Sequence, residues 1–340
     1  MNSVLIIAEA GVNHNADINL AKQLIDIAKE AGADIVKFQT AVPELVMTEQ
    51  AQKAVYQIEN TGVKNESQLE MAKKIHLPLT AYKELLDYSN QVGIKFLSTP
   101  FDHVSMQLLK DLGLDIFKIP SGEITNLPYL KAIGEMNTQV IISTGMANID
   151  EIENALNVLI NAGTKRENIT VLHCNTDYPT RMEDVNLHAM NTIGQKLNVS
   201  IGYSDHTLGI EVPIAAVALG AKVIEKHFTI SRSLDGPDHK ASLEPAELKL
   251  MVKAIRNIEK ALGNGIKVPS ASEKNNIVIA RRSIHLKSDL PKNHVVSEED
   301  LIMKRPGDGI SPMNLNLVLN KKLKSDFLKD HKLSLNDLID

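Results

Sequence analysis

Short apolar runs alternate with stretches of helical periodicity over the first three quarters of the chain. Runs rich in Val, Ile and Phe occur at 4–9, 34–39, 94–99, 115–120, 139–144, 170–174, 198–204 and 222–228. The stretches between them, such as "INLAKQLIDIAKEAG" and "IDEIENALNVLINAG", repeat apolar residues at helical spacing and close on a glycine suited to a left-handed cap. This alternation predicts a parallel sheet whose outer face is covered by helices.

Eight strand-helix units predict an α/β protein built on a (β/α)8 TIM barrel, a fold of typically ~250 residues. We assign 1–265 to this barrel, the polar segment beginning "IKVPSASEKNN" to a linker at 266–280, and 281–340 to a small second domain. The strands starting at 34 and 94 are unusually far apart. An insertion at about 41–77 therefore follows the second strand on the catalytic face, where we expect a lid or substrate-binding segment.

Polar side chains gather at the ends of the predicted strands, where TIM barrels carry their chemistry. In chain order these are Glu9, Lys37, Gln39, Ser98, Thr99, Lys118, Ser121, Ser143, Thr144, His173, Ser204, Asp205, His206, Glu225, Lys226 and His227. Burying so many polar groups without a ligand would be costly, which favours a cavity mouth. Any one of these side chains could instead fill the barrel interior or hydrogen-bond to the backbone of a loop. We interpret His173 as structural.

Composition excludes several other classes. The net charge is -5, with 37 basic and 42 acidic residues mixed along the chain, so no basic stripe for nucleic acid is expected. Cys174 is the single cysteine, which excludes an intramolecular disulfide framework, and the start lacks the features of a signal peptide. We expect a cytoplasmic protein. No apolar run approaches the roughly 20 residues that cross a bilayer, so no membrane partner is expected.

The strand-end motifs carry a family resemblance. In order they are "IAEAGVNHN", "VKFQT", "FLSTPFD", "FKIPSGEITNLPYL", "ISTGMA", "HCNTDYPT", "GYSDHT", "EKHFT" and "GPDHKASLEP". They resemble those of the sialic acid synthase family, the nonulosonate synthases, and "KRPGDGISP" resembles the signature of that family's C-terminal antifreeze-like (SAF) domain, of the β-clip type. Two departures concern loop shape: Ala16 stands where the family usually has glycine, and Arg181 where proline is common.

The resemblance implies a transferase that condenses phosphoenolpyruvate with an N-acetylated hexosamine and releases phosphate, using a divalent metal. Our main hypothesis is N-acetylneuraminate synthase, acting on N-acetylmannosamine. The alternative is N,N'-diacetyllegionaminate synthase, acting on 2,4-diacetamido-2,4,6-trideoxymannose, because these branches share the motifs. The resemblance also implies a homodimer with exchanged C-terminal domains, in which Arg305 contacts the N-acetyl group of the sugar. A surface arginine that stabilises the turn before Pro306 is the simpler interpretation.

The resemblance and the chemistry of phosphoenolpyruvate indicate roles for the strand-end cations and hydroxyls. A phosphate and a carboxylate need convergent cations and donors. Lys37 and Lys118 are the best candidate cations. Further substrate-binding candidates are Thr99, Ser121, Ser143, Tyr178, Ser204 and Asp238, with Asp238 assigned to the sugar hydroxyls.

The two histidines that end the seventh and eighth strands are the candidate metal ligands. These strands are neighbours in a barrel, so His206 and His227 can meet. Two nitrogen ligands leave open positions, which suits Mn²⁺ or Mg²⁺ better than a closed Zn²⁺ site. We assign a catalytic role to both histidines. Glu9 is the third catalytic candidate, as general base or as stabiliser of a cationic intermediate. A structural salt bridge from Glu9 to Lys37 or Lys118 is compatible with that role.

Two other classes stay open at this point. One is a barrel enzyme that forms a Schiff base through Lys118 or Lys226, which borohydride trapping would detect. The other is a carbohydrate-binding or structural protein without catalysis, which would release no phosphate from phosphoenolpyruvate.

Overall fold

The protein is described by a computed structural model that covers residues 3–340. The described chain divides into two compact units, one ending at Gly263 and the other beginning at Asn264. Each unit is considered by itself. The finer boundaries expected from the sequence, with a linker at 266–280, stay a prediction.

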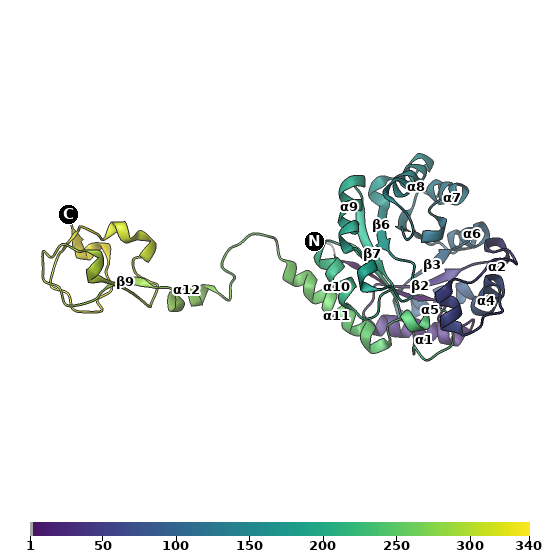
Figure 1. The fold of residues 1–340 in the computed structure, drawn as a ribbon, viewed down its shortest axis with the longest axis horizontal. Coiled ribbons are helices and arrows are strands. Elements are labelled where there is room, and N and C mark those ends of the chain that lie inside the picture. The colour runs from purple at the N-terminus through teal and green to yellow at the C-terminus, as the bar shows by residue number, and fades with distance from the viewer. Residues whose placement is uncertain (1–2) are drawn as a thin grey trace. The chain divides into compact units, whose positions relative to one another are not determined.

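The first unit is built on eight parallel strands (Figure 1). They are β1 (Leu5–Gly11), β2 (Ile35–Thr40), β3 (Lys95–Pro100), β4 (Ile116–Ile119), β5 (Gln139–Ser143), β6 (Ile169–Cys174), β7 (Ser200–Asp205) and β8 (Val223–His227). The hydrogen-bonded order is β3-β2-β1-β8-β7-β6-β5-β4, and β1 pairs with both β2 and β8. Because β3 and β4 also lie in contact, the sheet curls into a nearly closed barrel. The predicted TIM barrel and its strands are confirmed.

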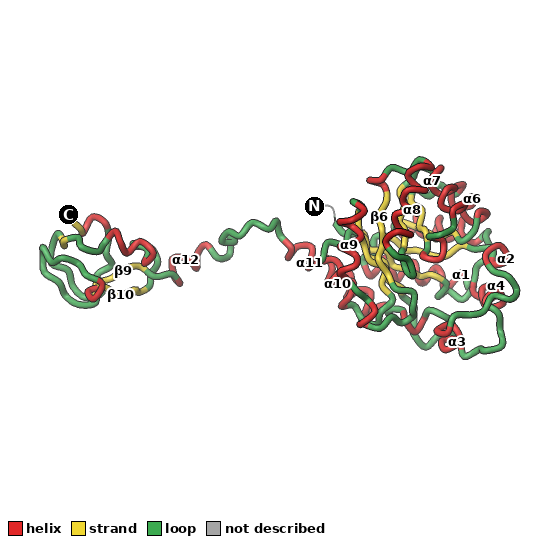
Figure 2. Tube along the Cα trace, turned by 45° about the horizontal axis from the view of Figure 1, so that its top comes forward, coloured by secondary structure: helices red, strands yellow, loops and turns green. Residues whose placement is uncertain are grey.

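Helices surround this sheet, as Figure 2 shows in red around the yellow strands. Those that follow the strands are α1 (Ile18–Ala31), α5 (Ala81–Val92), α6 (His103–Asp111), α7 (Leu127–Glu135), α8 (Ile149–Ala162), α9 (Leu187–Leu197), α10 (Glu211–Ala218) and α11 (Pro245–Leu262). The local signals are visible in α1, where the Asp17 side chain accepts hydrogen bonds from the first-turn amides and Gly32, with φ 82°, ends the helix. Its buried face packs on the outside of the barrel.

The insertion between β2 and β3 forms three short helices. They are α2 (Pro43–Val46), α3 (Val55–Thr61) and α4 (Gln68–Ile75). The buried ammonium of Lys53 lies 2.9 Å from a carboxylate oxygen of Glu66, which holds the segment together. The Asn60 side chain donates to the carbonyl of Pro237 over 2.6 Å. The insertion is therefore tied to the loop that follows β8, at the C-terminal end of the barrel.

The second unit has a small core of its own. Helix α12 (Lys274–Ala280) lies within the segment expected to be a linker, and antiparallel pairs join β9 (Ser283–Leu286) to β10 (Leu301–Lys304) and β11 (Lys322–Leu323) to β12 (Leu338–Ile339). The core consists of Ile284, Leu286, Leu290, Val296, Leu301, Val318, Leu323 and Leu333. The one stretch with helical periodicity forms a 3-10 helix at Pro312–Leu317. Among residues 3–340, no helix combines the length and apolar character needed to cross a membrane.

Candidate active site

The site arises from the two-residue periodicity of the strands. One apolar layer fills the barrel interior, made of Ile7, Ile35, Leu97, Ile116, Ile141, Leu172 and Val223. Side chains two residues apart on a strand point to the same side, so the residues two positions further on also face inward. These are Glu9, Lys37, Thr99, Lys118, Ser143, Cys174 and Glu225. The apolar layer forms the floor, and the polar layer above it opens toward the strand ends.

A cavity of about 370 Å³ lies over this polar layer. The structure brings together there every barrel residue predicted from the sequence, namely Glu9, Lys37, Thr99, Lys118, Ser121, Ser143, Tyr178, Ser204, His206, His227 and Asp238. Arg305 belongs to the second unit, where it is exposed and its Nε donates to the carbonyl of Ala280 over 3.0 Å. The roles assigned to these residues stay predictions.

Two lysines and two glutamates form a buried charge cluster at the centre of the cavity. The Lys37 ammonium lies 3.1 Å from Glu9 Oε2 and 3.2 Å from Glu225 Oε2, and donates to Thr99 Oγ1 over 2.9 Å. The Lys118 ammonium donates to Ser143 Oγ over 2.7 Å and lies 3.5 Å from Glu225 Oε1. The salt bridge expected between Glu9 and Lys37 is therefore present, while Glu225 joins both lysines.

Burial and mutual charge set the protonation of this cluster. Burial raises the pKa of Glu9 to about 7, although the nearby positive charge of Lys37 partly offsets this rise. The pKa of Glu225 falls well below its usual range because Lys118 and Lys37 outweigh the cost of burial. Burial lowers the pKa of Lys118, whereas Glu225 and Glu9 overcome burial at Lys37 and raise its pKa. Glu225 is thus the firmly ionised carboxylate, and Glu9 can exchange a proton near neutral pH.

The two histidines lie side by side at the cavity wall. The ring centroids of His206 and His227 are 5.4 Å apart, and Tyr178 stacks on His206 at 4.0 Å. His206 Nδ1 bonds to the carbonyl of Asn175, which can only accept, so Nδ1 carries the proton and Nε2 keeps its lone pair. Burial lowers the pKa of His206 to about 4 and that of His227 well below its usual range. Both rings are neutral at pH 7, the form that binds metals.

These observations fit a metal held by few protein ligands. His227 Nδ1 is buried without a hydrogen-bond partner among the described residues, and lies 3.9 Å from Asp238 Oδ2. No group of three or more His, Cys, Asp or Glu suited to hold a metal occurs within residues 3–340. Two imidazoles alone would leave most coordination positions to water and substrate, as expected for Mn²⁺ or Mg²⁺.

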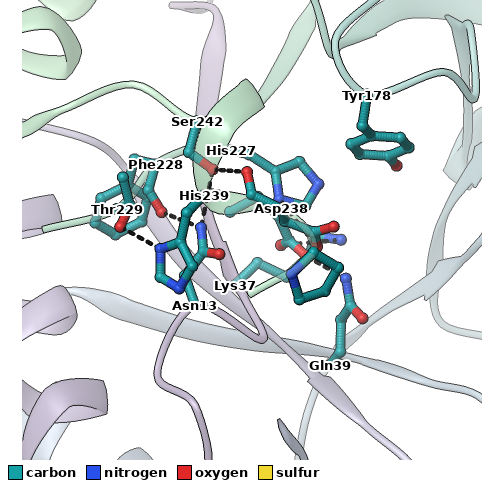
Figure 3. A network of polar contacts seen from close by, with 12 residues as sticks. Asn13, Lys37, Gln39, Tyr178, His227, Phe228, Thr229, Asp238, His239 and Ser242 are labelled. Carbon is teal, nitrogen blue, oxygen red and sulfur yellow. Dashed lines mark hydrogen bonds and ion pairs between the residues drawn. The ribbon is translucent and has the colours of Figure 1, made fainter. Parts of the chain in front are cut away.

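Figure 3 shows the surroundings of Asp238 and His227 together with Lys37, Gln39 and Tyr178. Burial raises the pKa of Asp238 to about 7. Gln39, a strand-end residue without a predicted role, donates from Nε2 to Glu9 Oε1 over 3.2 Å. It therefore restrains one carboxylate oxygen of the candidate base, while Lys37 pairs with the other.

Glu225 was named among the strand-end polar residues but received no role. The strand period could have assigned it to the site, because it stands two residues after the inward-facing Val223, whereas the cavity residues of the insertion were missed. The insertion contributes Val46, Met47, Tyr56, Gln57, Gln68, Met71, Ala72, Ile75 and His76. No local pattern marks these residues, because they reach the cavity only through tertiary packing.

Five strand-end residues lie outside the cavity lining, namely Ser98, Thr144, His173, Asp205 and Lys226. Lys226 is fully buried with its ammonium 2.5 Å from Asp205 Oδ2, an environment that does not suit a Schiff-base nucleophile. His173 Nε2 bonds to the carbonyl of Val185. Ala16 has φ 58°, in the left-handed region, which explains the family's usual glycine at this position.

A TIM barrel that gathers buried lysines, ionisable carboxylates and a neutral histidine pair at its strand ends has the layout of an enzyme for an anionic substrate. The comparisons with known proteins name the family. The model of the NeuB family matches residues 24–267, and the model of the SAF domain matches residues 281–339. The chain belongs to the NeuB family, and the predicted membership of the sialic acid synthases with a C-terminal SAF domain is confirmed. The predicted transferase class is confirmed with it.

Relatives match over nearly their whole length. An N,N'-diacetyllegionaminic acid synthase of Campylobacter jejuni is 54% identical, covering 97% of this chain and 98% of its own. A protein of the same name from Legionella pneumophila is 45% identical, covering 94% and 90%. Among solved structures, the N-acetylneuraminic acid (sialic acid) synthetase of Leptospira borgpetersenii in complex with citrate is 38% identical, with a TM-score of 0.71, covering 81% of this chain and 90% of that one.

Proposed function

We propose that this chain is an N,N'-diacetyllegionaminate synthase, which condenses phosphoenolpyruvate with 2,4-diacetamido-2,4,6-trideoxymannose and water and releases phosphate. The observation that carries the proposal is the identity of 54% over almost both full lengths to a relative of that name. It favours the alternative considered from the sequence over the main hypothesis. N-acetylneuraminate synthase is the second candidate, supported by the 38% identity to the Leptospira protein.

The composition of the cavity wall supports a deoxy sugar. The strand ends supply polar residues, and the insertion adds the apolar residues Val46, Met47, Met71, Ala72 and Ile75 together with Tyr56, Gln57, Gln68 and His76. The proposed sugar has a methyl group at C6 where N-acetylmannosamine has a hydroxymethyl group. A buried methyl group is stabilised by about 0.8 kcal/mol, whereas a buried hydroxyl without a partner costs about 1–3 kcal/mol. An apolar wall therefore favours the trideoxy sugar.

Phosphoenolpyruvate would bind over the lysines. Lys37 and Lys118 come from β2 and β4, so their ammonium groups approach an anion from two directions. Their present partners, Thr99 and Ser143, supply hydroxyls beside the same ammonium groups. Ser121 and Ser204 also line the cavity and complete the set of donors. This arrangement holds the enol with its methylene carbon free to react.

The reaction joins the methylene carbon of phosphoenolpyruvate to the aldehyde carbon of the sugar, adds water at the enol carbon and expels phosphate. Glu9 is 1% exposed and has a pKa near neutrality, so it can take a proton from that water or stabilise the cation that precedes it. Asp238 and Tyr178 would orient the sugar hydroxyls. A divalent metal, Mn²⁺ or Mg²⁺, would be held by His206 and His227 and would supply Lewis-acid polarisation of the aldehyde oxygen.

The same proposal includes a cytoplasmic homodimer with exchanged C-terminal domains, in which Arg305 of one subunit contacts an N-acetyl group in the other barrel. Family membership supports this arrangement, and a guanidinium can hold an amide oxygen while keeping its charge. Chains carrying His206→Ala or Arg305→Ala, unfolded together and refolded, test it. Heterodimers should regain up to about half activity per dimer, because one of their two sites carries neither change. Heterodimers without activity would contradict the exchange.

The sugar assignment is tested by phosphate release from phosphoenolpyruvate with each sugar and each divalent metal. We expect kcat/KM for 2,4-diacetamido-2,4,6-trideoxymannose to exceed that for N-acetylmannosamine by at least an order of magnitude, the equivalent of about 1.4 kcal/mol. The reverse ratio would favour N-acetylneuraminate synthase. Loss of phosphate release with both sugars would contradict the family reaction altogether.

A further inference from the structure

The buried amide of Asn13 joins three segments that carry the site. Asn13 follows β1, the strand of Glu9, and is 1% exposed. Its Nδ2 donates to the carbonyl of Phe228 over 2.8 Å and to Ser242 Oγ over 2.9 Å. Ser242 Oγ in turn donates to the carbonyl of Asp238 over 2.7 Å. Figure 3 shows this chain of contacts beside His227 and Asp238.

The direction of each hydrogen bond follows from the groups involved. The Phe228 carbonyl can only accept, so the Asn13 atom that faces it must be the nitrogen. The single proton of the Ser242 hydroxyl goes to the Asp238 carbonyl, so that hydroxyl must accept from Asn13. Both amide protons of Asn13 are therefore used, and no side chain without two such protons can replace it.

Asp238 depends on this support because nothing else holds its side chain. No described residue donates a hydrogen bond to its carboxylate, and the neutral His227 Nδ1 lies 3.9 Å from Asp238 Oδ2. A short 3-10 turn, His239–Ala241, separates Asp238 from Ser242. The carboxylate is therefore placed by the backbone of this turn, and the Asp238 carbonyl accepts from Ser242 Oγ and, over a longer 3.2 Å, from the amide of Ala241.

We propose that Asn13 and Ser242 are positioning residues for the sugar, acting through Asp238. Asn13 holds the backbone just after His227 and, through Ser242, the turn that carries Asp238. The inference rests on the proposed function, in which Asp238 binds the sugar. It predicts an effect confined to one substrate, because Lys37 and Lys118, the proposed phosphoenolpyruvate ligands, lie on β2 and β4 and make no contact with this network.

Two substitutions separate the links. Asn13→Asp keeps the size of the side chain but removes both donors and sets an oxygen against the Phe228 carbonyl. Ser242→Ala removes both hydrogen bonds of the hydroxyl, the one from Asn13 and the one to Asp238, and leaves the Asn13–Phe228 bond. The matched control is Asn191→Asp, which also removes an amide that donates to a backbone carbonyl. Asn191 Nδ2 donates to the carbonyl of Leu219 over 2.9 Å, and Asn191 does not line the cavity.

Initial rates with phosphoenolpyruvate and the trideoxy sugar, melting temperatures and crystal structures are compared across these variants. We expect Ser242→Ala to raise KM for the sugar about tenfold, the equivalent of one hydrogen bond, with KM for phosphoenolpyruvate within about twofold of wild type. Asn13→Asp should raise KM for the sugar further and also lower kcat, whereas Asn191→Asp should change neither KM for the sugar nor kcat. Ser242→Thr, which keeps the hydroxyl, should recover most of the sugar affinity.

The proposal is overturned if Ser242→Ala lowers the melting temperature but leaves both KM values unchanged, since the network would then be structural only. Equal changes in the two KM values overturn it as well. If the wild type turns over neither sugar, the proposed function fails separately. The crystal structures then decide the positioning: displacement of the Asp238 carboxylate in Ser242→Ala supports it, and an unchanged carboxylate contradicts it.

Discussion

Replacing Lys118 by methionine tests the phosphoenolpyruvate site most sharply. The Lys118 ammonium is buried, donates to Ser143 Oγ over 2.7 Å and lies 3.5 Å from Glu225. Methionine keeps most of the apolar stem and removes only the charged end. We expect KM for phosphoenolpyruvate to rise strongly while KM for the sugar changes little, because the sugar candidates Asp238 and Tyr178 come from other segments of the cavity.

The size of the effect follows from the contact that is lost. A hydrogen bond to a charged group contributes about 1.5–3 kcal/mol, so its loss should raise KM for phosphoenolpyruvate roughly 10- to 150-fold. Loss of the charge also leaves Glu225 with Lys37 as its remaining ion-pair partner at 3.2 Å. The cluster then holds one ammonium and two carboxylates, and it stays neutral when Glu9, whose pKa is about 7, takes up a proton, so we expect the barrel to stay folded.

Lys226→Met is the matched control. Lys226 is a buried lysine next to the site, but its charge pairs with Asp205 and does not reach the cavity. The Lys226→Met substitution should lower the melting temperature and leave KM for phosphoenolpyruvate within about threefold of wild type. Initial rates of phosphate release, measured against each substrate in turn, give both KM values. An equal rise of both in Lys118→Met, or the same rise in Lys226→Met, would refute the assignment.

Three further predictions concern the metal, the sugar and pH. His206→Ala should abolish turnover and weaken Mn²⁺ binding measured by calorimetry while the circular dichroism stays native; full activity of the wild type in chelator would contradict the metal site. Met71→Gln should lower kcat/KM for the trideoxy sugar about tenfold but not that for N-acetylmannosamine, whereas the exposed Met182→Gln should change neither. Burial lowers the pKa of His14 to about 3, so the unfolded chain binds the extra proton first and stability falls as pH drops from about 6.5 toward 3, by up to roughly 4 kcal/mol. His14→Gln should flatten that part of the urea-denaturation profile, and an unchanged slope would show that His14 is not the cause.

Much of the barrel could be predicted because its signals are local. Each strand is a short apolar run, and its helix carries its own caps, as Asp17 and Gly32 do for α1. The inward-facing polar layer follows the same two-residue period, which brings Glu9, Lys37 and Lys118 into one cavity without knowledge of the fold's details.

The remaining features depend on contacts between distant segments. The pairing of Glu225 with two lysines from other strands, and the apolar wall supplied by Met71, arise only once the barrel closes. The Asn13 network likewise joins residues more than 200 positions apart. Sequence motifs shared by several sugar synthases did not separate their substrates, because the residues that the insertion adds to the cavity carry no motif of their own.

The most direct test of the proposed function is a competition between the two sugars. The protein, phosphoenolpyruvate in limiting amount and Mn²⁺ are incubated with equal concentrations of 2,4-diacetamido-2,4,6-trideoxymannose and N-acetylmannosamine, and products and phosphate are quantified by mass spectrometry and colorimetry. We predict that N,N'-diacetyllegionaminate accounts for more than nine tenths of the product, with one phosphate released per product molecule. A predominance of N-acetylneuraminate, or phosphate release without a nine-carbon sugar, would contradict the proposed function.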